Sequence, residues 1–268
     1  MTGEVTAMAE MPVRVHAQLK PRTPARRQSA VGIVGVLLLW ECAVRCGAVD
    51  AASCPAPTMI MTELAALAAT GILGKALAAS GLRWLVGMVL GSTVGVALAV
   101  AAGRCTRVGG WVLPWVHLLY PVPKIALLPL FVLWLGIGEW PKSVIIALGA
   151  FFPVFINTWN GIGRLPVRYD EVVAIYPVGT RYYLRKILLP AAAPAIFVGL
   201  KLAAGSALVL LVAAEMLAAD TGIGALILHY GDLMLTAPLL ACVTVLGAAG
   251  LCIQYLIGRA ERYVIRWR

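Results

Sequence analysis

Charged residues are scarce in this chain of 268 residues: they make up 13% of it, whereas hydrophobic residues make up 61%. Soluble domains carry about 25% charged and about 45–50% apolar residues, so this composition excludes an ordinary soluble domain. A chain this apolar needs the hydrocarbon of a bilayer around it. The net charge of +10 would suggest nucleic acid in a soluble protein. Here we expect it to mark the cytoplasmic side of a membrane, with no nucleic-acid partner.

Patterns for metal binding and catalysis are also missing. The six cysteines form no CxxC pair, there is no HExxH motif, and the three histidines are isolated from one another. Cys42 and Cys46 share one helical face, but no further ligand lies near them in the sequence, so we interpret both as packing residues. No Ser/His/Asp order is visible. We therefore predict no catalytic residue and no metal site.

No phosphate loop of the form GxxxxGK[ST] occurs in the chain. Gly87, Gly91 and Gly95 recur every fourth residue, but the lysine and the context of a phosphate loop are absent. Small residues at this spacing allow two helices to approach closely. We interpret these glycines as a helix-packing stripe and expect no cofactor in this chain.

Six apolar segments are long enough to cross the membrane, which takes about 20 helical residues. They lie near 31–49, 76–102, 111–136, 141–161, 191–218 and 236–258. The third is interrupted by Pro121, Pro123 and Pro129. We predict an all-α membrane protein of about six transmembrane helices. Its transmembrane domain covers 31–258, between a flexible cytoplasmic tail at 1–30 and a basic cytoplasmic tail at 259–268.

The distribution of basic residues predicts the orientation. With the N-terminus inside, the outer loops hold only two basic residues, Lys75 and Lys142, and most of the other Lys and Arg residues fall in the inner segments. Those inner segments are 1–30, 103–110, 162–190 and 259–268. The opposite orientation would violate the positive-inside rule. Both termini are therefore expected in the cytoplasm.

The cytoplasmic loop at 163–190 is much longer than the usual connection of about 2–8 residues between helices. Pro166 can begin a short helix. Pro177 and Gly179 then change the direction of the chain, and Thr180 can cap a second short helix that runs through Ile187. Pro190 would open the next span. By composition alone, this segment could be an amphipathic hairpin on lipid headgroups or a docking surface for a protein.

The loop resembles the EAA loop of ABC-importer permeases, which runs from a glutamate to a terminal Leu-Pro. Glu171 and Pro190 are separated by the nineteen positions of that motif, and Ile187-Leu188-Leu189-Pro190 matches its end. Other stretches are similar to the nitrate/sulfonate/taurine branch of these permeases. They are Tyr120–Pro123, Leu128–Leu130, Trp134–Gly138, Pro194, Gly199–Lys201, Val212–Glu215 and Thr221–Gly224. One departure is Pro177, which stands where the family motif has glycine.

The resemblance implies a type I ABC-importer permease fold in a bacterial inner membrane, with transport by alternating access and no catalysis in this chain. The implied partners are a second permease copy, two cytoplasmic ATPase subunits that bind ATP and magnesium, and an external solute-binding protein. The implied ATPase-coupling residues are Asp170, Glu171, Val172, Val173, Ala174, Pro177, Gly179, Thr180, Arg181, Leu189 and Pro190. The implied solute is a small anion such as nitrate, a sulfonate or taurine.

Ionisable residues inside a membrane are costly and point to function. Glu41 and Arg45 are spaced to pair on one helical face, and we interpret them as structural. Arg83 is either an interfacial anchor or a functional group. The residues that we expect along the translocation path or its gate are Tyr120, Pro121, Pro123, Lys124, Trp134 and Glu215.

The main alternative is a secondary transporter with an interfacial amphipathic loop. Such a protein normally shows paired broken helices in two related halves and membrane acids that couple to ions. This sequence has one proline-broken region and no second half that matches it. The permease interpretation is therefore favoured.

Overall fold

The computed structural model describes residues 26–163 and 179–266, and every regular element in these ranges is a helix. In chain order the elements are α1 (Arg26–Arg45), α2 (Pro57–Ala69), α3 (Ile72–Arg104), α4 (Thr106–Leu119), η1 (Lys124–Leu127), α5 (Leu128–Leu135), α6 (Glu139–Gly163), α8 (Thr180–Tyr183), η2 (Leu184–Leu188), α9 (Leu189–Ala218), α10 (Ile223–Asp232) and α11 (Thr236–Val264). Of the two η elements, η1 is a 3₁₀ turn and η2 is a π turn. The prediction of an all-α chain is confirmed.

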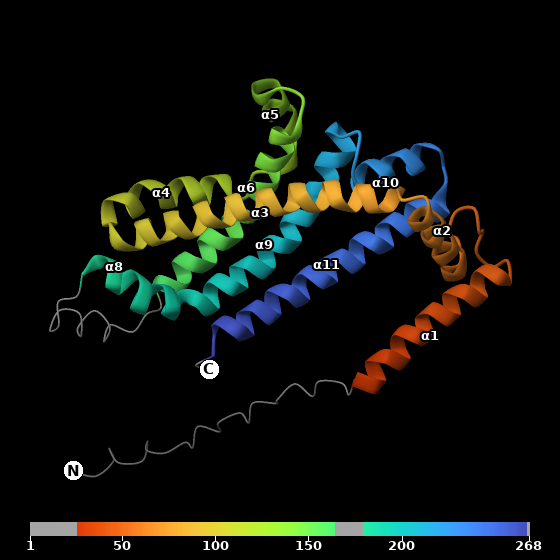
Figure 1. Cartoon of the computed structure of the whole chain (residues 1–268), viewed down its shortest axis with the longest axis horizontal. Coiled ribbons are helices and arrows are strands. Elements are labelled where there is room, and N and C mark those ends of the chain that lie inside the picture. The colour runs from red at the N-terminus through yellow and green to blue at the C-terminus, as the bar shows by residue number, and fades with distance from the viewer. Residues whose placement is uncertain (1–25, 164–178, 267–268) are drawn as a thin grey trace, which may run out of the picture.

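Four helices of the described chain are long and apolar enough to cross a membrane: α3, α6, α11 and the continuous helix Thr180–Ala218. The pair α4 and α5 makes a fifth if it is a single broken span, and its two parts meet at an angle of 97°. The remaining predicted span corresponds to α1, whose apolar residues between Val31 and Leu39 are exposed. Figure 1 shows α1 standing apart from the bundle, beyond α2.

Several helices begin or end at other residues than predicted. The first helix ends at Arg45 rather than at residue 49, and Gly47 follows with a φ of +74°. The last helix continues to Val264, so the predicted tail at 259–268 is helical over much of its length. Two short helices, α2 and α10, lie in the predicted outer loops and were not predicted.

The core lies along α6, which packs against α3 on one side and α9 on the other. Small residues of α9 and branched residues of α6 fill this interface. Its fully buried members include Ile145, Ile146, Ala150, Val154, Ala203, Ala204 and Ala207. Alanines allow the two helix backbones to approach, which is how membrane helices gain packing contact when lipid is as apolar as the side chains.

The glycine stripe of α3 packs against α6, as predicted. A β-carbon at Gly87 would collide with the side chain of Ile146, and one at Gly91 would collide with the carbonyl group of Ala147. At Gly95, the nearest atom to such a β-carbon would be the carbonyl oxygen of Phe151, at 3.0 Å. The stripe therefore sets the distance between α3 and α6.

Pro190 lies in the first turn of α9, where it was predicted to open the span, but the expected separate short helix is wrong because a single helix runs from Thr180 to Ala218. Proline cannot donate the backbone hydrogen bond of an α-helix. The π turn immediately before it changes the hydrogen-bond register, with the amide of Leu189 donating to the carbonyl of Leu184. The predicted N-cap is also wrong, because Gly179 occupies the cap position and Thr180 is the first helical residue.

Candidate functional site

The most extensive polar cluster of the described chain lies around Glu215, near the end of α9. Glu215 is fully buried. Its carboxylate accepts a hydrogen bond from the Ser80 hydroxyl, at 2.8 Å to each oxygen, and one from Arg83 Nη1 at 2.7 Å. Ser80 and Arg83 belong to α3 and are themselves buried. A buried carboxylate with these partners is compensated in both charge and hydrogen bonding.

Arg83 extends the cluster to the start of α6. Its guanidinium forms a bidentate ion pair with Glu139: Nε donates to Oε2, and Nη2 donates to Oε1 at 2.9 Å. Lys142 Nζ donates to the same carboxylate at 2.9 Å. The Glu139 side chain is 60% exposed, whereas those of Arg83 and Lys142 are almost fully buried. The cluster thus has a sealed side at Glu215 and a water-facing side at Glu139.

The turn between α9 and α10 closes the cluster. Arg83 also donates to the Thr221 carbonyl oxygen and, at 3.0 Å, to the Thr221 hydroxyl. The amide of Ile223 donates to Ser80 Oγ at 2.9 Å, and the amide of Gly224 donates to Glu215 Oε2 at 2.9 Å. These amides belong to the first turn of α10, where backbone donors lack partners within the helix. Glu215 and Ser80 satisfy two of them.

Two glycines make this turn fit. Gly222 has a φ of +128°, and a β-carbon there would overlap the Glu215 carboxylate. A β-carbon at Gly224 would lie 2.6 Å from the Val212 carbonyl oxygen. The stretches Val212–Glu215 and Thr221–Gly224 therefore pack directly against each other at the end of α9. We refer to Ser80, Arg83, Glu139, Lys142, Glu215 and Thr221 as the outer network, after the predicted orientation of this end of α9.

The structure corrects one interpretation of Arg83 and separates two residues that the sequence analysis grouped. Arg83 does not extend to an interface, because it is buried and paired. Glu215 and Lys124 do not lie in one cluster, since the partners of the Glu215 carboxylate in the described chain belong to the outer network or to the first turn of α10. Glu41 and Arg45 form the predicted pair, with Arg45 Nε donating to Glu41 Oε1 at 2.6 Å.

Lys124 lies at the break between α4 and α5. Its ammonium group donates to the Tyr120 carbonyl oxygen at 2.8 Å and to the Val122 carbonyl oxygen at 3.4 Å. It also lies 4.6 Å from the centre of the Phe152 ring and 5.3 Å from that of Tyr120. The chain leaves its helical course between Pro121 and Pro123, which provides the carbonyl groups for this arrangement.

The other residues expected along the path are mostly exposed in the single chain. The exposed fraction is 51% for Tyr120 and 65% for Trp134, and Pro121 and Pro123 are exposed. Trp134 lies on α5 and meets Phe131 edge to face, with the ring centres 6.0 Å apart. The break therefore presents aromatic and proline side chains outside the core.

The described part of the predicted coupling segment begins at Gly179. Asp170, Glu171, Val172, Val173, Ala174 and Pro177 lie outside the described residues. Gly179, Thr180 and Arg181 are exposed, while Leu189 and Pro190 are half-buried. The guanidinium of Arg104, at the end of α3, lies over the Tyr183 ring at 5.4 Å from its centre. A cation–π contact thus joins the α3–α4 corner to the start of the continuous helix.

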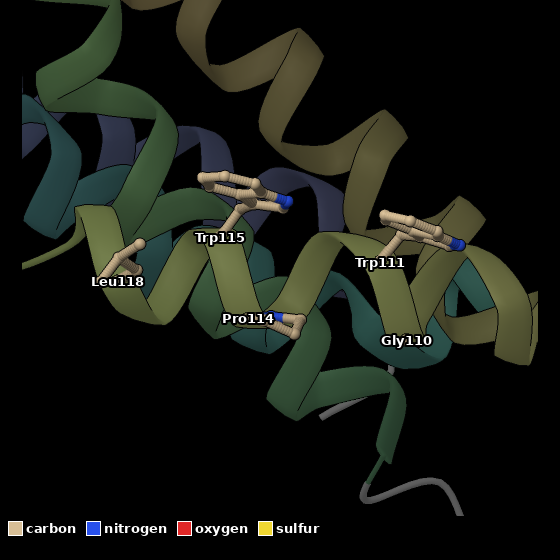
Figure 2. A pocket seen from close by; sticks show the side chains of 5 residues that line it. All are labelled: Gly110, Trp111, Pro114, Trp115 and Leu118. Carbon is tan, nitrogen blue, oxygen red and sulfur yellow. The ribbon is translucent and has the colours of Figure 1, made fainter.

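An aromatic face on α4 went unnoticed in the sequence. Trp111, Trp115 and Leu118 are exposed on α4 and line a shallow pocket with Gly110 and Pro114. Figure 2 shows the two indole rings projecting from the same side of the helix. Their spacing of four residues, which places side chains on one helical face, could have indicated this surface.

These features define a class of protein: a helical membrane component with a broken span, a long continuous helix that begins at Thr180, and no catalytic cluster among the described residues. Residues 91–266 match the family of binding-protein-dependent transport system inner membrane components, and the chain belongs to that family. It is a permease component of a binding-protein-dependent ABC importer, an inner membrane protein that is not itself catalytic.

Similar proteins agree on this class. The chain is 32% identical to the putative aliphatic sulfonates transport permease protein SsuC of Bacillus subtilis, over 87% of this chain and 84% of that protein. It is 29% identical to the taurine transport system permease protein TauC of Escherichia coli, over 95% and 96% of the two chains. A solved structure of the MetNI methionine ABC transporter matches 73% of this chain and 95% of that chain. The match has a TM-score of 0.57 and 20% identity, which supports the fold.

Proposed function

We propose that the chain forms the translocation path of an ATP-driven importer for a small anion and works by alternating access. One observation carries this proposal: the continuous helix Thr180–Ala218 joins the end of the coupling segment to Glu215. At about 1.5 Å per residue it is about 58 Å long, enough to cross the membrane. Movement of a partner against the loop can therefore be transmitted to the outer network by one rigid element. Both termini lie in the cytoplasm in this arrangement.

The coupling partner is an ATPase that binds the loop at 163–190 through Glu171 and its neighbours. ATP and magnesium bind in that separate subunit, and the permease chain needs no cofactor of its own. The resemblance of the loop to the EAA motif supports this assignment. So does the exposure of Gly179–Arg181, the part of the loop next to the continuous helix, which is available to a partner.

We propose a homodimer of permease chains because each chain offers one coupling segment, whereas the importer family uses two permease halves with two ATPases. The exposed aromatic face of α4 adds an apolar surface that a second copy could cover. The mass of the purified complex tests this assembly. A complex with a single permease chain that retains ATP-driven uptake would refute it.

The names of the relatives support a small anion as the solute. They include permeases for aliphatic sulfonates, for taurine and for nitrate import. An external solute-binding protein makes the first selection among such solutes. A binding screen of that protein with nitrate, taurine and ethanesulfonate identifies the solute.

The coupling assignment is tested with Glu171→Ala in the full complex. We expect the ATPase to stop copurifying with the permease, and uptake to be lost. The matched control is Asp232→Ala, which removes an exposed carboxylate in the last turn of α10, on the other side of the bilayer. Uptake by Glu171→Ala with normal coupling to ATP would refute the docking role of Glu171.

A further inference from the structure

Lys124 differs from Arg83, Lys142 and Lys201, three basic side chains within the spanning helices, in how its charge is compensated. Arg83 pairs with Glu139 and Glu215, Lys142 with Glu139, and Lys201 with Glu261. Within the part of the chain that the structure describes, Lys124 forms no salt bridge with a carboxylate. The chain therefore neutralises these other cations and leaves this one charged.

The groups that hold Lys124 are neutral. Two carbonyl oxygens accept its hydrogen bonds, and two aromatic rings face it. Carbonyl dipoles and ring faces stabilise an ammonium group and fix its position without cancelling its charge. A lysine ammonium has three donors, and the carbonyls use two of them. The third donor can bind an anion.

The depth of Lys124 makes this arrangement costly. Phe152, which contacts the ammonium group, lies near the middle of α6, a helix long enough to span the membrane. Lys124 itself occupies the bend between α4 and α5. A charged side chain at mid-membrane is costly even on insertion scales. A charge that is retained there with no carboxylate partner among the described residues points to a function rather than to stability.

We propose that Lys124 is a specificity-determining residue, which binds the oxyanion of the solute transiently as it passes the middle of the membrane. The solute acts as the counterion that the described part of the chain does not supply. A sulfonate or nitrate oxygen would accept the third N–H, while the carbonyls and rings hold the ammonium group in place. Because the groups that hold Lys124 are neutral, its positive charge stays available to attract an anion in each transport cycle. The inference rests on the proposed function, in that this chain lines the path.

The test compares Lys124→Gln, Lys124→Arg and wild type in the complete transporter, reconstituted with its solute-binding protein. The probes are ethanesulfonate, taurine and nitrate, whichever the binding protein delivers. Lys75→Gln is the matched control, because it removes an exposed lysine at the outer end of α3. The measured quantities are the maximal uptake rate, the half-saturating concentration of loaded binding protein, and ATP hydrolysis.

We expect Lys124→Gln to lower the maximal uptake rate at least tenfold, with an unchanged half-saturating concentration and ATP hydrolysis within twofold of wild type. Lys124→Arg should keep a third or more of the uptake, and Lys75→Gln all of it. Wild-type uptake by Lys124→Gln would overturn the inference. So would an equal loss in Lys124→Arg, since that result would point to side-chain shape rather than charge.

The proposed function and the inference fail in different ways. An assembled wild-type transporter that carries only an uncharged solute would overturn the role of Lys124 but leave ATP-driven import intact. Failure of the wild-type permease to bind an ATPase would instead refute the proposed coupling. Without an ATPase, the role of Lys124 can still be tested by the partitioning of ethanesulfonate into vesicles that contain the permease alone. Equal partitioning with wild type and with Lys124→Gln would overturn the inference as well.

Discussion

Arg83 Nη1 and Glu215 Oε1 lie 2.7 Å apart, although the two residues are 132 positions apart in the sequence. Both side chains are buried, and their contact joins α3 to the end of α9. Because the same carboxylate accepts the Gly224 amide, the pair also fixes the first turn of α10. The ion pair thus ties α3 to α9 and α10, which lie far from it in the sequence.

Replacing Glu215 with glutamine should destabilise the permease strongly. Removal of one partner from a buried ion pair costs about 3–5 kcal/mol, because the remaining charge loses its compensation. Arg83 would still contact Glu139, which places the expected cost toward the lower end. Thermal unfolding of the purified complex measures the change. Asp232→Asn, which neutralises an exposed carboxylate of α10, should leave the melting temperature unchanged, and an equal effect of both variants would contradict the argument.

Gly222→Ala should also destabilise the protein, for two reasons that act together. The positive φ disfavours a residue with a side chain, at about 1–3 kcal/mol for a sparsely populated conformation, and the new methyl group would overlap the Glu215 carboxylate. Gly205→Ala in α9 is the control, since a β-carbon there meets no atom within 4 Å. The yield and melting temperature of the complex decide the outcome. A Gly222→Ala protein as stable as the Gly205→Ala protein would show that the turn can relax.

Two glycines of α3 provide a matched pair for the packing of α3 on α6. A β-carbon at Gly91 would collide with the Ala147 carbonyl group, whereas one at Gly81 would meet nothing within 4 Å. Overpacking of a well-packed interface costs about 1–3 kcal/mol, so Gly91→Ala should lower the melting temperature. Gly81→Ala should raise it slightly, because alanine favours the helix. The same direction of change in both variants would contradict the proposed spacing role of the stripe.

Features of the sequence that act over short distances were predictable. The long apolar runs gave the spans, the four-residue spacing of Gly87, Gly91 and Gly95 gave the packing stripe, and the same spacing gave the Glu41–Arg45 pair. Each of these follows from the helix repeat and from hydropathy alone.

Features that depend on tertiary contact or on a change in hydrogen-bond register were not predictable. No local pattern pairs Arg83 with Glu215, because the contact exists only after α3 and α9 pack against α6. The helix through Pro190 was missed because proline normally ends a helix, and the compensating π turn has no clear signal in the sequence. Likewise, the sequence placed Lys124 at a break but could not provide the Phe152 ring beside it.

The contact between Arg104 and Tyr183 should affect coupling more than stability. Arg104 is exposed, and cation–π contacts at exposed sites are worth about 0.5–1 kcal/mol, or about two- to fivefold in an equilibrium constant. Because the contact joins the α3–α4 corner to the first turn of the continuous helix, its loss should weaken the transmission of movement from the coupling segment. Arg104→Ala should therefore lower the ratio of uptake to ATP hydrolysis by about that factor, while Arg104→Lys retains part of it. Arg107→Ala removes a neighbouring exposed arginine outside this contact and should leave the ratio unchanged. An equal decrease in both alanine variants would assign the effect to the loss of positive charge at the membrane surface, because Arg104, unlike Arg107, lies over the Tyr183 ring.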